Sequence, residues 1–202
     1  KIVLEPEYDG IITSNSTDII LIKDEKFGNY NIPSNKIIQP KHKSILNPIG
    51  ENLYLVNDSN YGLIDKEGNV LLPVEYNNIQ FWSDSTVLVE RENIFKVIDV
   101  YSKKISHEFN SYKTLLNSKH KIIQISSDNG IGILSNTYGM ILKPNYDEIR
   151  MIDYDKKTYF NGRQSIEEAK LLVNLLVDDQ GKIIINQALN LDIRANFSCE
   201  LN

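Results

Sequence analysis

One stretch decides the fold because its pattern recurs along the chain: Tyr61-Gly62-Leu63-Ile64-Asp65-Lys66-Glu67-Gly68-Asn69-Val70-Leu71-Leu72-Pro73-Val74-Glu75-Tyr76-Asn77-Asn78-Ile79. Its second half joins an apolar run, a proline, an aromatic ring and an isoleucine. The ring position recurs at steps of 34, 34, 33 and 37 residues, as Tyr8, His42, Tyr76, Phe109 and Tyr146. A last, weaker copy runs from 182 to 191. Self-similarity at such a period is the signature of a repeat architecture.

The first half of the stretch recurs in the same register. An aromatic or apolar residue followed by glycine appears at Phe27-Gly28, Tyr61-Gly62 and Ile131-Gly132, and the equivalent pair in the third repeat is Phe95-Lys96. A final copy runs from Leu175 to Gly181. Two independent markers with one spacing indicate internal repeats.

Each repeat is predicted to consist of strands. Short β-branched and aliphatic runs lie between the two markers and are bounded by Asn, Asp, Ser and Gly, which is typical of strands joined by tight turns. We therefore expect an all-β fold of about five 34-residue repeats, with roughly three strands in each. The chain would form a single domain, 1–202, whose units are approximately 1–35, 36–69, 70–103, 104–139, 140–181 and a partial 182–202.

The sequence leaves two arrangements of these repeats open, a propeller-like ring and an open β-superhelix. Lys1-Ile2-Val3-Leu4 begins in the middle of a unit, and 182–191 is a partial copy of the same portion. Such an offset lets the two ends of a ring meet and protects edge strands, which favours the ring slightly.

The fifth unit is longer than the others by about eight residues, and the surplus lies around 158–170. Ser165-Ile166-Glu167-Glu168 has the spacing of a capping box, so a short helix is expected near 165–172. Alternatively, Leu171–Val177 is the ordinary strand of the unit and only the residues before it are inserted.

Composition excludes several classes of protein. The chain has 202 residues, 22 Lys and Arg against 27 Asp and Glu, and a net charge of -5, which disfavours nucleic acid as a partner. No apolar run is long enough to span a membrane. The single cysteine, Cys199, excludes an intramolecular disulfide, and a cytoplasmic location is expected.

The two recurring markers of the repeats resemble the sequence pattern of the WG-repeat (KWG-repeat) family of bacterial proteins. The family pattern runs aromatic-Gly, two apolar residues, Asp, a Gly turn, an apolar pair, Pro, Tyr and Ile, and it matches best at Tyr61–Ile79 and well at Met140–Ile149. No Trp-Gly pair is present, so the chain resembles a degenerate member. The resemblance implies a β-repeat domain used for binding, without catalytic residues.

No arrangement of side chains in the sequence indicates catalysis, a cofactor or a metal. The recurring carboxylates Asp65, Asp99 and Asp178 lie in equivalent turns of different units, whereas a catalytic pair must converge on one point. His42, His107 and His120 have no carboxylate at ligand or triad spacing. We therefore expect a protein that is not an enzyme; an enzyme such as a carbohydrate hydrolase on a repeat scaffold is the alternative to a binding protein.

Two segments that follow the isoleucine of a repeat are candidates for binding a protein partner. Aromatic and acidic residues together are typical of an interface with a basic protein. The candidate residues are Phe81, Trp82, Asp84, Asp153, Tyr154, Asp155, Tyr159, Phe160, Glu167 and Glu168. Alternatively, Phe81 and Trp82 complete the core under the next unit.

Function is expected to rest on protein–protein interaction. The hypothesis is an inhibitor or immunity protein that neutralises a bacterial toxin such as a nuclease, because residues 145–181 hold eight acidic and five basic residues. A carbohydrate-active or cell-surface carbohydrate-binding repeat protein is the alternative.

Overall fold

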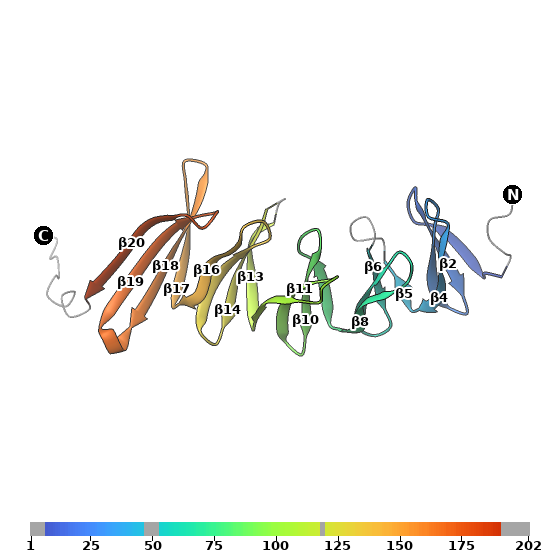
Figure 1. The fold of residues 1–202 in the computed structure, drawn as a ribbon, viewed down its shortest axis with the longest axis horizontal. Coiled ribbons are helices and arrows are strands. Elements are labelled where there is room, and N and C mark those ends of the chain that lie inside the picture. Colours follow the sequence, from blue (N-terminus) through green and yellow to red (C-terminus); the bar gives the residue numbers. More distant parts are fainter. Residues whose placement is uncertain (1–6, 47–52, 118–119, 191–202) are drawn as a thin grey trace, which may run out of the picture. The chain divides into compact units, whose positions relative to one another are not determined.

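The structure is a computed structural model that describes residues 7–46, 53–117 and 120–190. Its fold is all-β, as predicted. Cys199 and the start Lys1-Ile2-Val3-Leu4 lie outside these residues. Five antiparallel sheets of four strands follow one another along the chain, coloured from blue to red in Figure 1, and none is closed on itself. Their strands are, for sheet 1, β1 (Gly10–Thr13), β2 (Asp18–Lys23), β3 (Lys26–Asn31) and β4 (Lys36–His42); for sheet 2, β5 (Ser44–Ile45), β6 (Leu53–Asn57), β7 (Tyr61–Asp65) and β8 (Val70–Tyr76); for sheet 3, β9 (Asn78–Phe81), β10 (Thr86–Arg91), β11 (Ile94–Asp99) and β12 (Ile105–Phe109); for sheet 4, β13 (Ser111–Asn117), β14 (Lys121–Ser127), β15 (Gly130–Ser135) and β16 (Gly139–Tyr146); and for sheet 5, β17 (Glu148–Tyr154), β18 (Lys157–Ile166), β19 (Leu171–Asp178) and β20 (Ile183–Asn190).

The sheets begin and end at the ring position, so they are shifted relative to the predicted units. In sheets 1 to 4 the last strand ends at His42, Tyr76, Phe109 and Tyr146, and the next sheet starts two residues later. Each repeat therefore has four strands and not three. One linking residue between two strands leaves no turn signal, so the last strand of one sheet and the first of the next read as a single strand in the sequence.

The chain divides into two compact units, 1–107 and 108–202. In the first unit, sheet 2 is buried on both faces because successive residues of a strand point to opposite sides. Leu53, Leu55 and Leu63 pack in one core with Val87 and other residues of sheet 3. Tyr54, Val56 and Ile64 pack in a second core with Ile38 of sheet 1. The continuous apolar run of β6 is thus explained by its two buried faces.

The second unit has a core between sheets 4 and 5. Ile122, Ile133 and Leu142 of sheet 4 pack against Phe160 and Val177 of sheet 5, and all five side chains are at most 2% exposed. This core forms in the same way as those of the first unit, from apolar residues on facing sheets. Stacking of neighbours therefore supplies what a single repeat cannot bury.

The recurring turn carboxylates have the structural role that the sequence predicts. Asp65 Oδ1 accepts hydrogen bonds from the backbone N–H groups of Glu67 (2.9 Å) and Asn69 (2.8 Å). Asp178 Oδ1 accepts equivalent bonds from Gln180 (3.1 Å) and Lys182 (2.8 Å). A carboxylate that accepts from its own turn in this way stabilises the turn.

The predicted helix near 165–172 is absent in that form. Ser165 belongs to β18, where it pairs with Leu172, and only Glu167–Ala169 forms a single 3-10 turn, which has no side-chain cap and ends at Lys170 in the left-handed conformation. The surplus residues lengthen strands instead, because β18 has ten residues whereas β10, its equivalent in sheet 3, has six. The eight paired positions between β18 and β19 outweigh the capping-box signal.

Candidate functional site

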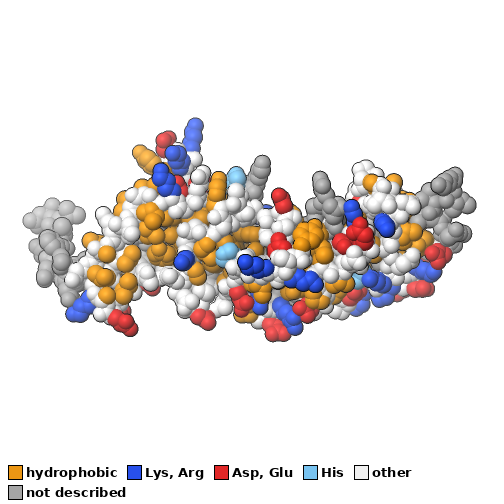
Figure 2. Space-filling model, in the orientation of Figure 1, with side chains coloured by type: hydrophobic (Ala, Val, Ile, Leu, Met, Phe, Trp, Pro, Cys, Tyr) orange, Lys and Arg blue, Asp and Glu red, His pale blue; other side chains and the backbone are white. Residues whose placement is uncertain are grey.

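The β17–β18 hairpin carries a run of exposed side chains, and the ribbon shows it projecting beyond the rest of sheet 5 (Figure 1). Asp155 (φ 48°) and Lys156 (φ 61°) form its two-residue turn, which is the geometry of a type I′ hairpin. All side chains from 151 to 157 are exposed, and Tyr154 is the most exposed of the large apolar residues, at 73%. Apolar, acidic and basic side chains lie together there (Figure 2).

The predicted partner-binding residues divide into an exposed and a buried group. Exposed are Asp84, Asp153, Tyr154, Asp155, Glu167 and Glu168, while Tyr159 is half-buried. Phe160 is 0% exposed and Trp82 is 7% exposed, and Phe81 packs against the core between sheets 2 and 3. The prediction is therefore wrong for Phe160 and Trp82, because a partner cannot reach a side chain that fills a core. For Trp82 and Phe81 the alternative, a role in the core, is confirmed.

The two predicted segments occupy equivalent positions in their sheets. Asn78–Phe81 and Glu148–Tyr154 are both first strands, β9 and β17, and each is followed by the turn to the second strand. They belong to different compact units. The acidic residues of sheet 5 also lie far apart. Asp153 and Asp155 precede the start of β18, whereas Glu167 and Glu168 follow its end. Ten strand residues correspond to roughly 30 Å, so these carboxylates do not form one patch.

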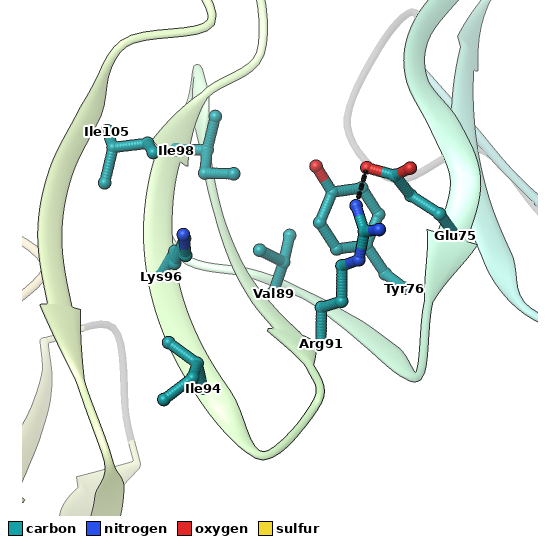
Figure 3. A pocket seen from close by; sticks show the side chains of 8 residues that line it. All are labelled: Glu75, Tyr76, Val89, Arg91, Ile94, Lys96, Ile98 and Ile105. Carbon is teal, nitrogen blue, oxygen red and sulfur yellow. Dashed lines mark ion pairs between the residues drawn. The ribbon is translucent and has the colours of Figure 1, made fainter.

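A cavity of about 200 Å³ lies in the first unit between β8 and sheet 3. Its lining comprises Glu75 and Tyr76 of β8, Val89 and Arg91 of β10, Ile94, Lys96 and Ile98 of β11, and Ile105 of β12. Figure 3 shows the Arg91–Glu75 ion pair on one side and Lys96, Ile98 and Ile105 on the other. Arg91 Nη1 lies 2.6 Å from Glu75 Oε1. Burial raises the pKa of Tyr76, so its hydroxyl is a neutral hydrogen-bonding group.

A buried carboxylate, Asp18, lies at the junction of sheets 1 and 2. It is 2% exposed and accepts hydrogen bonds from Tyr54 Oη (2.5 Å), Asn29 Nδ2 (2.9 Å) and Asn31 Nδ2 (3.0 Å) at Oδ1, and from Thr17 Oγ1 (2.8 Å) at Oδ2. Burial acts to raise the pKa of Asp18, but these bonds outweigh it and lower the pKa to about 2. Burial, followed by the bond to Asp18, raises the pKa of Tyr54. The group is fully paired and is structural.

His42 has a carboxylate partner that its sequence spacing did not reveal. Its Nδ1 lies 2.7 Å from Asp58 Oδ2, and Asp58 Oδ1 accepts from the backbone N–H of Lys43 at 2.8 Å. Burial acts to raise the pKa of Asp58, but these two contacts outweigh it and lower that pKa. His42 is 6% exposed, and its buried Nε2 has no partner among the described residues. His42 is buried at the end of β4, while Asp58 is partly exposed, and the pair tethers the β6–β7 turn.

The described part of the chain contains no group of three or more His, Cys, Asp or Glu side chains that could hold a metal ion. Nor does any helix in residues 7–46, 53–117 and 120–190 have the length and apolar character needed to cross a membrane.

Comparison with known proteins identifies a repeat family. Residues 61–93, from β7 through β10, match the family described as WG containing repeat. The chain thus contains a WG repeat, which confirms the resemblance, and this family indicates a repeat-based protein-interaction domain. No curated protein sequence matches the chain.

Solved structures with similar arrangements share little sequence with the chain. A eukaryotic initiation factor is 10% identical with a TM-score of 0.40, over 91% of this chain and 55% of that one. Hsv2 of Kluyveromyces lactis is 10% identical with a TM-score of 0.37, over 87% and 61%. PorZ of Porphyromonas gingivalis, a surface component of the type-IX secretion system, is 10% identical with a TM-score of 0.35, over 91% and 28%. The chain spans about half the length of the first of these.

Proposed function

We propose that the chain is a non-enzymatic protein-binding repeat protein that inhibits a bacterial toxin, such as a nuclease, in the cytoplasm. The observation that carries this proposal is the β17–β18 hairpin, which exposes Met151 (41%), Ile152 (41%) and Tyr154 (73%) on an element held at its base by sheet 5. Large apolar side chains on a projecting pair of strands are suited to insertion into a cleft of a partner.

The hairpin tip carries Asp153 and Asp155 against Lys156 and Lys157, so the case for a basic partner rests on the two carboxylates beside Tyr154 and not on a net charge. Asp153 and Asp155 flank Tyr154, which has the largest exposed fraction of the large apolar residues that the structure describes, and Thr158 Oγ1 donates to Asp153 Oδ1 at 2.7 Å. An apolar anchor between two carboxylates fits a cleft lined by cations, as in a protein that binds nucleic acid. Such charges speed association more than they strengthen the complex. The distant Glu167 and Glu168 would then contribute little.

The test is co-expression of the chain with the toxin encoded by a neighbouring gene, followed by growth measurement and purification of the complex. We expect growth rescue and a stoichiometric complex. Tyr154→Ala should weaken binding about 30-fold or more, because a hot-spot tyrosine contributes 2 kcal/mol or more. Tyr101→Ala is the matched control, because Tyr101 is also exposed (60%) but lies in the first unit. Absence of a complex, or of rescue, would contradict the proposal for that toxin.

A second comparison tests the charges. Asp153→Asn with Asp155→Asn should lower the association rate at low salt and have little effect at high salt, because salt screens exposed charges. Glu167→Gln with Glu168→Gln removes the same charge at the other end of β18 and should leave the rate nearly unchanged. If both double substitutions changed the association rate equally, the role of Asp153 and Asp155 would be contradicted and only the apolar part of the proposal would remain.

A further inference from the structure

The fourth strand of sheet 5, β20, forms one edge of that sheet and is exposed along its whole length. All eight residues from Ile183 to Asn190 are exposed, and β20 pairs with β19 but with no other strand that the structure describes (Figure 1). Its four large apolar side chains are 42–57% exposed, namely Leu189, Ile185, Ile184 and Ile183. A long, apolar and exposed edge strand is a template for pairing with another strand.

β20 lacks the residue that protects the equivalent edge in the other four sheets. In every sheet a residue with positive φ marks the start of the fourth strand, and these residues are Asn35, Gly68, Lys103, Gly139 and Gly181. The fifth residue after each of them is, in the same order, Pro40, Pro73, Glu108, Pro144 and Asn186. Proline has no N–H to donate and a charged side chain resists pairing, so both discourage a further strand. β20 contains neither.

The pairing of β19 with β20 fixes which backbone groups point to the open edge. The N–H of Asp178 donates to the carbonyl oxygen of Lys182 at 3.0 Å, so the backbone groups of Asp178 face β20. Because these groups alternate in direction along a strand, those of Asn174 also face β20, where Asn174 pairs with Gln187. The backbone groups of Gln187 are therefore directed at β19, and those of its two neighbours in the sequence point to the open edge.

This arrangement makes β20 complementary to a second copy of itself. In an antiparallel pair with its two-fold axis at Gln187, Asn186 of one copy lies opposite Ala188 of the other, and the two residues exchange both backbone hydrogen bonds. The symmetry repeats this exchange on the other side of the axis. In the same register Ile185, which is 44% exposed, lies opposite Leu189, which is 42% exposed. These pairs have no backbone bonds between them, so their Cα atoms approach to about 4.5 Å and their side chains pack closely.

The charges of the chain favour a second copy as the occupant of this edge. The whole chain has a net charge of -5, so two copies repel each other where their acidic residues approach. β20 carries only aliphatic and amide side chains. A strand of this kind needs no partner of opposite charge, and its best match is another neutral strand with apolar residues in the same register.

We propose that β20 pairs antiparallel with β20 of a second copy of the chain, centred on Gln187, so that sheet 5 of the two copies forms one continuous sheet of eight strands. This contact is isologous and closes on itself, so it ends at a dimer and does not extend into a fibre. One strand from each copy is much less than the roughly 20–30 residues a side of a standard interface, so the dimer should be weak and depend on concentration. The inference is independent of the toxin proposal, because it requires no other protein.

The test is sedimentation of the full chain alone, from about 1 μM to about 1 mM, where a weak interface changes from monomer to dimer. Asn186→Pro introduces the residue that sheets 1, 2 and 4 have at this position and removes one inter-chain N–H from each copy, so it should weaken the dimer about tenfold or more. Gln187→Lys places two like charges opposite each other and should also weaken it. Gln180→Lys is the matched control, because it adds the same charge at an exposed turn position of sheet 5, and it should leave the dimer unchanged. Circular dichroism checks that each variant is folded.

A cysteine at the axis tests the register. In a chain that carries Cys199→Ser, Gln187→Cys should form a disulfide-linked dimer on mild oxidation, because a Cα separation of about 4.5 Å suits a disulfide, whereas Gln180→Cys should not. A chain that stays monomeric over the whole concentration range overturns the proposal, and protection of the β20 amides from hydrogen exchange in that monomer would show that the chain itself covers the edge. A dimer that Asn186→Pro and Gln187→Lys leave unchanged, or that Gln180→Lys weakens equally, overturns it as well.

Discussion

Tyr54 Oη of β6 donates a hydrogen bond of 2.5 Å to Asp18 Oδ1 of β2, across 36 residues of sequence and between two successive sheets. Both residues are only 2% exposed. Tyr54 belongs to the core between sheets 1 and 2, where Ile38, Val56 and Ile64 also pack. A buried polar pair of this kind contributes to stability only as long as both partners are present.

Tyr54→Phe is expected to lower the free energy of unfolding of the first unit by about 1–3 kcal/mol, because Asp18 loses one donor to its buried carboxylate. Urea unfolding followed by the fluorescence of Trp82, which is buried in the same unit, measures this. Tyr101→Phe is the control, since Tyr101 is exposed and the change should stay within about 0.5 kcal/mol. Equal effects of the two changes would contradict the assigned role of the pair.

Acid should destabilise the first unit through Asp18. The pKa of this carboxyl is lowered from 3.8 to about 2, so the folded state binds its proton more weakly than the unfolded state does. Its contribution of about 2 kcal/mol is present above pH ~4 and is lost as the pH falls towards ~2. The measurement is the free energy of unfolding against pH for the wild type and Asp18→Asn. The same pH series is measured for Asp99→Asn and compared with that of Asp18→Asn, because hydrogen bonds from Ser102 and Ser85 also lower the pKa of Asp99 to about 2. Parallel curves for the wild type and Asp18→Asn would exclude this role.

Two aromatic residues six positions apart in sheet 5 should respond in opposite ways. Phe160→Ala should destabilise the second unit by about 3–5 kcal/mol, because the side chain is fully buried against Ile133 and Val177. Tyr154→Ala should change stability by no more than about 0.5 kcal/mol. Urea unfolding followed by circular dichroism checks both. A large loss for Tyr154→Ala would show that the hairpin tip belongs to the fold and is not a free binding element.

Gly132→Ala and Lys96→Ala compare equivalent positions of two repeats. Gly132→Ala should destabilise its unit by about 1–3 kcal/mol, because the added Cβ meets the Leu142 carbonyl oxygen at 2.7 Å. Lys96→Ala should stay within about 0.5 kcal/mol, because sheet 3 already accommodates a side chain there. Thermal melts of the two variants provide the measurement. If alanine at Gly132 were tolerated, it would contradict the close approach of β16 to this glycine.

Sequence predicted the repeats, the strands and the turn carboxylates, because all three depend on local patterns. The predicted number of strands per repeat was wrong, because a single residue separates one sheet from the next and leaves no turn signal in the sequence. These residues are Lys43, Asn77, Asn110 and Asp147. The helix near 165–172 was wrong because pairing of β18 with β19 prevailed over a local capping signal.

The candidate site was predicted only in part. Tyr154 and Phe160 carry the same aromatic signal, but Tyr154 ends β17 at the exposed hairpin tip, whereas Phe160 lies within β18 and is buried in the core. The His42–Asp58 contact and the lining of the cavity depend on residues brought together by folding, so spacing could not reveal them.

Hydrogen exchange of the chain in complex with the neighbouring toxin tests the central claim most directly. The account predicts slower amide exchange on binding at residues 149–159, around the exposed tip of the hairpin, and unchanged exchange at 80–86, where Trp82 is buried. Protection confined to the first unit, or a complex that leaves 149–159 unchanged, would contradict the claim that this hairpin binds the partner.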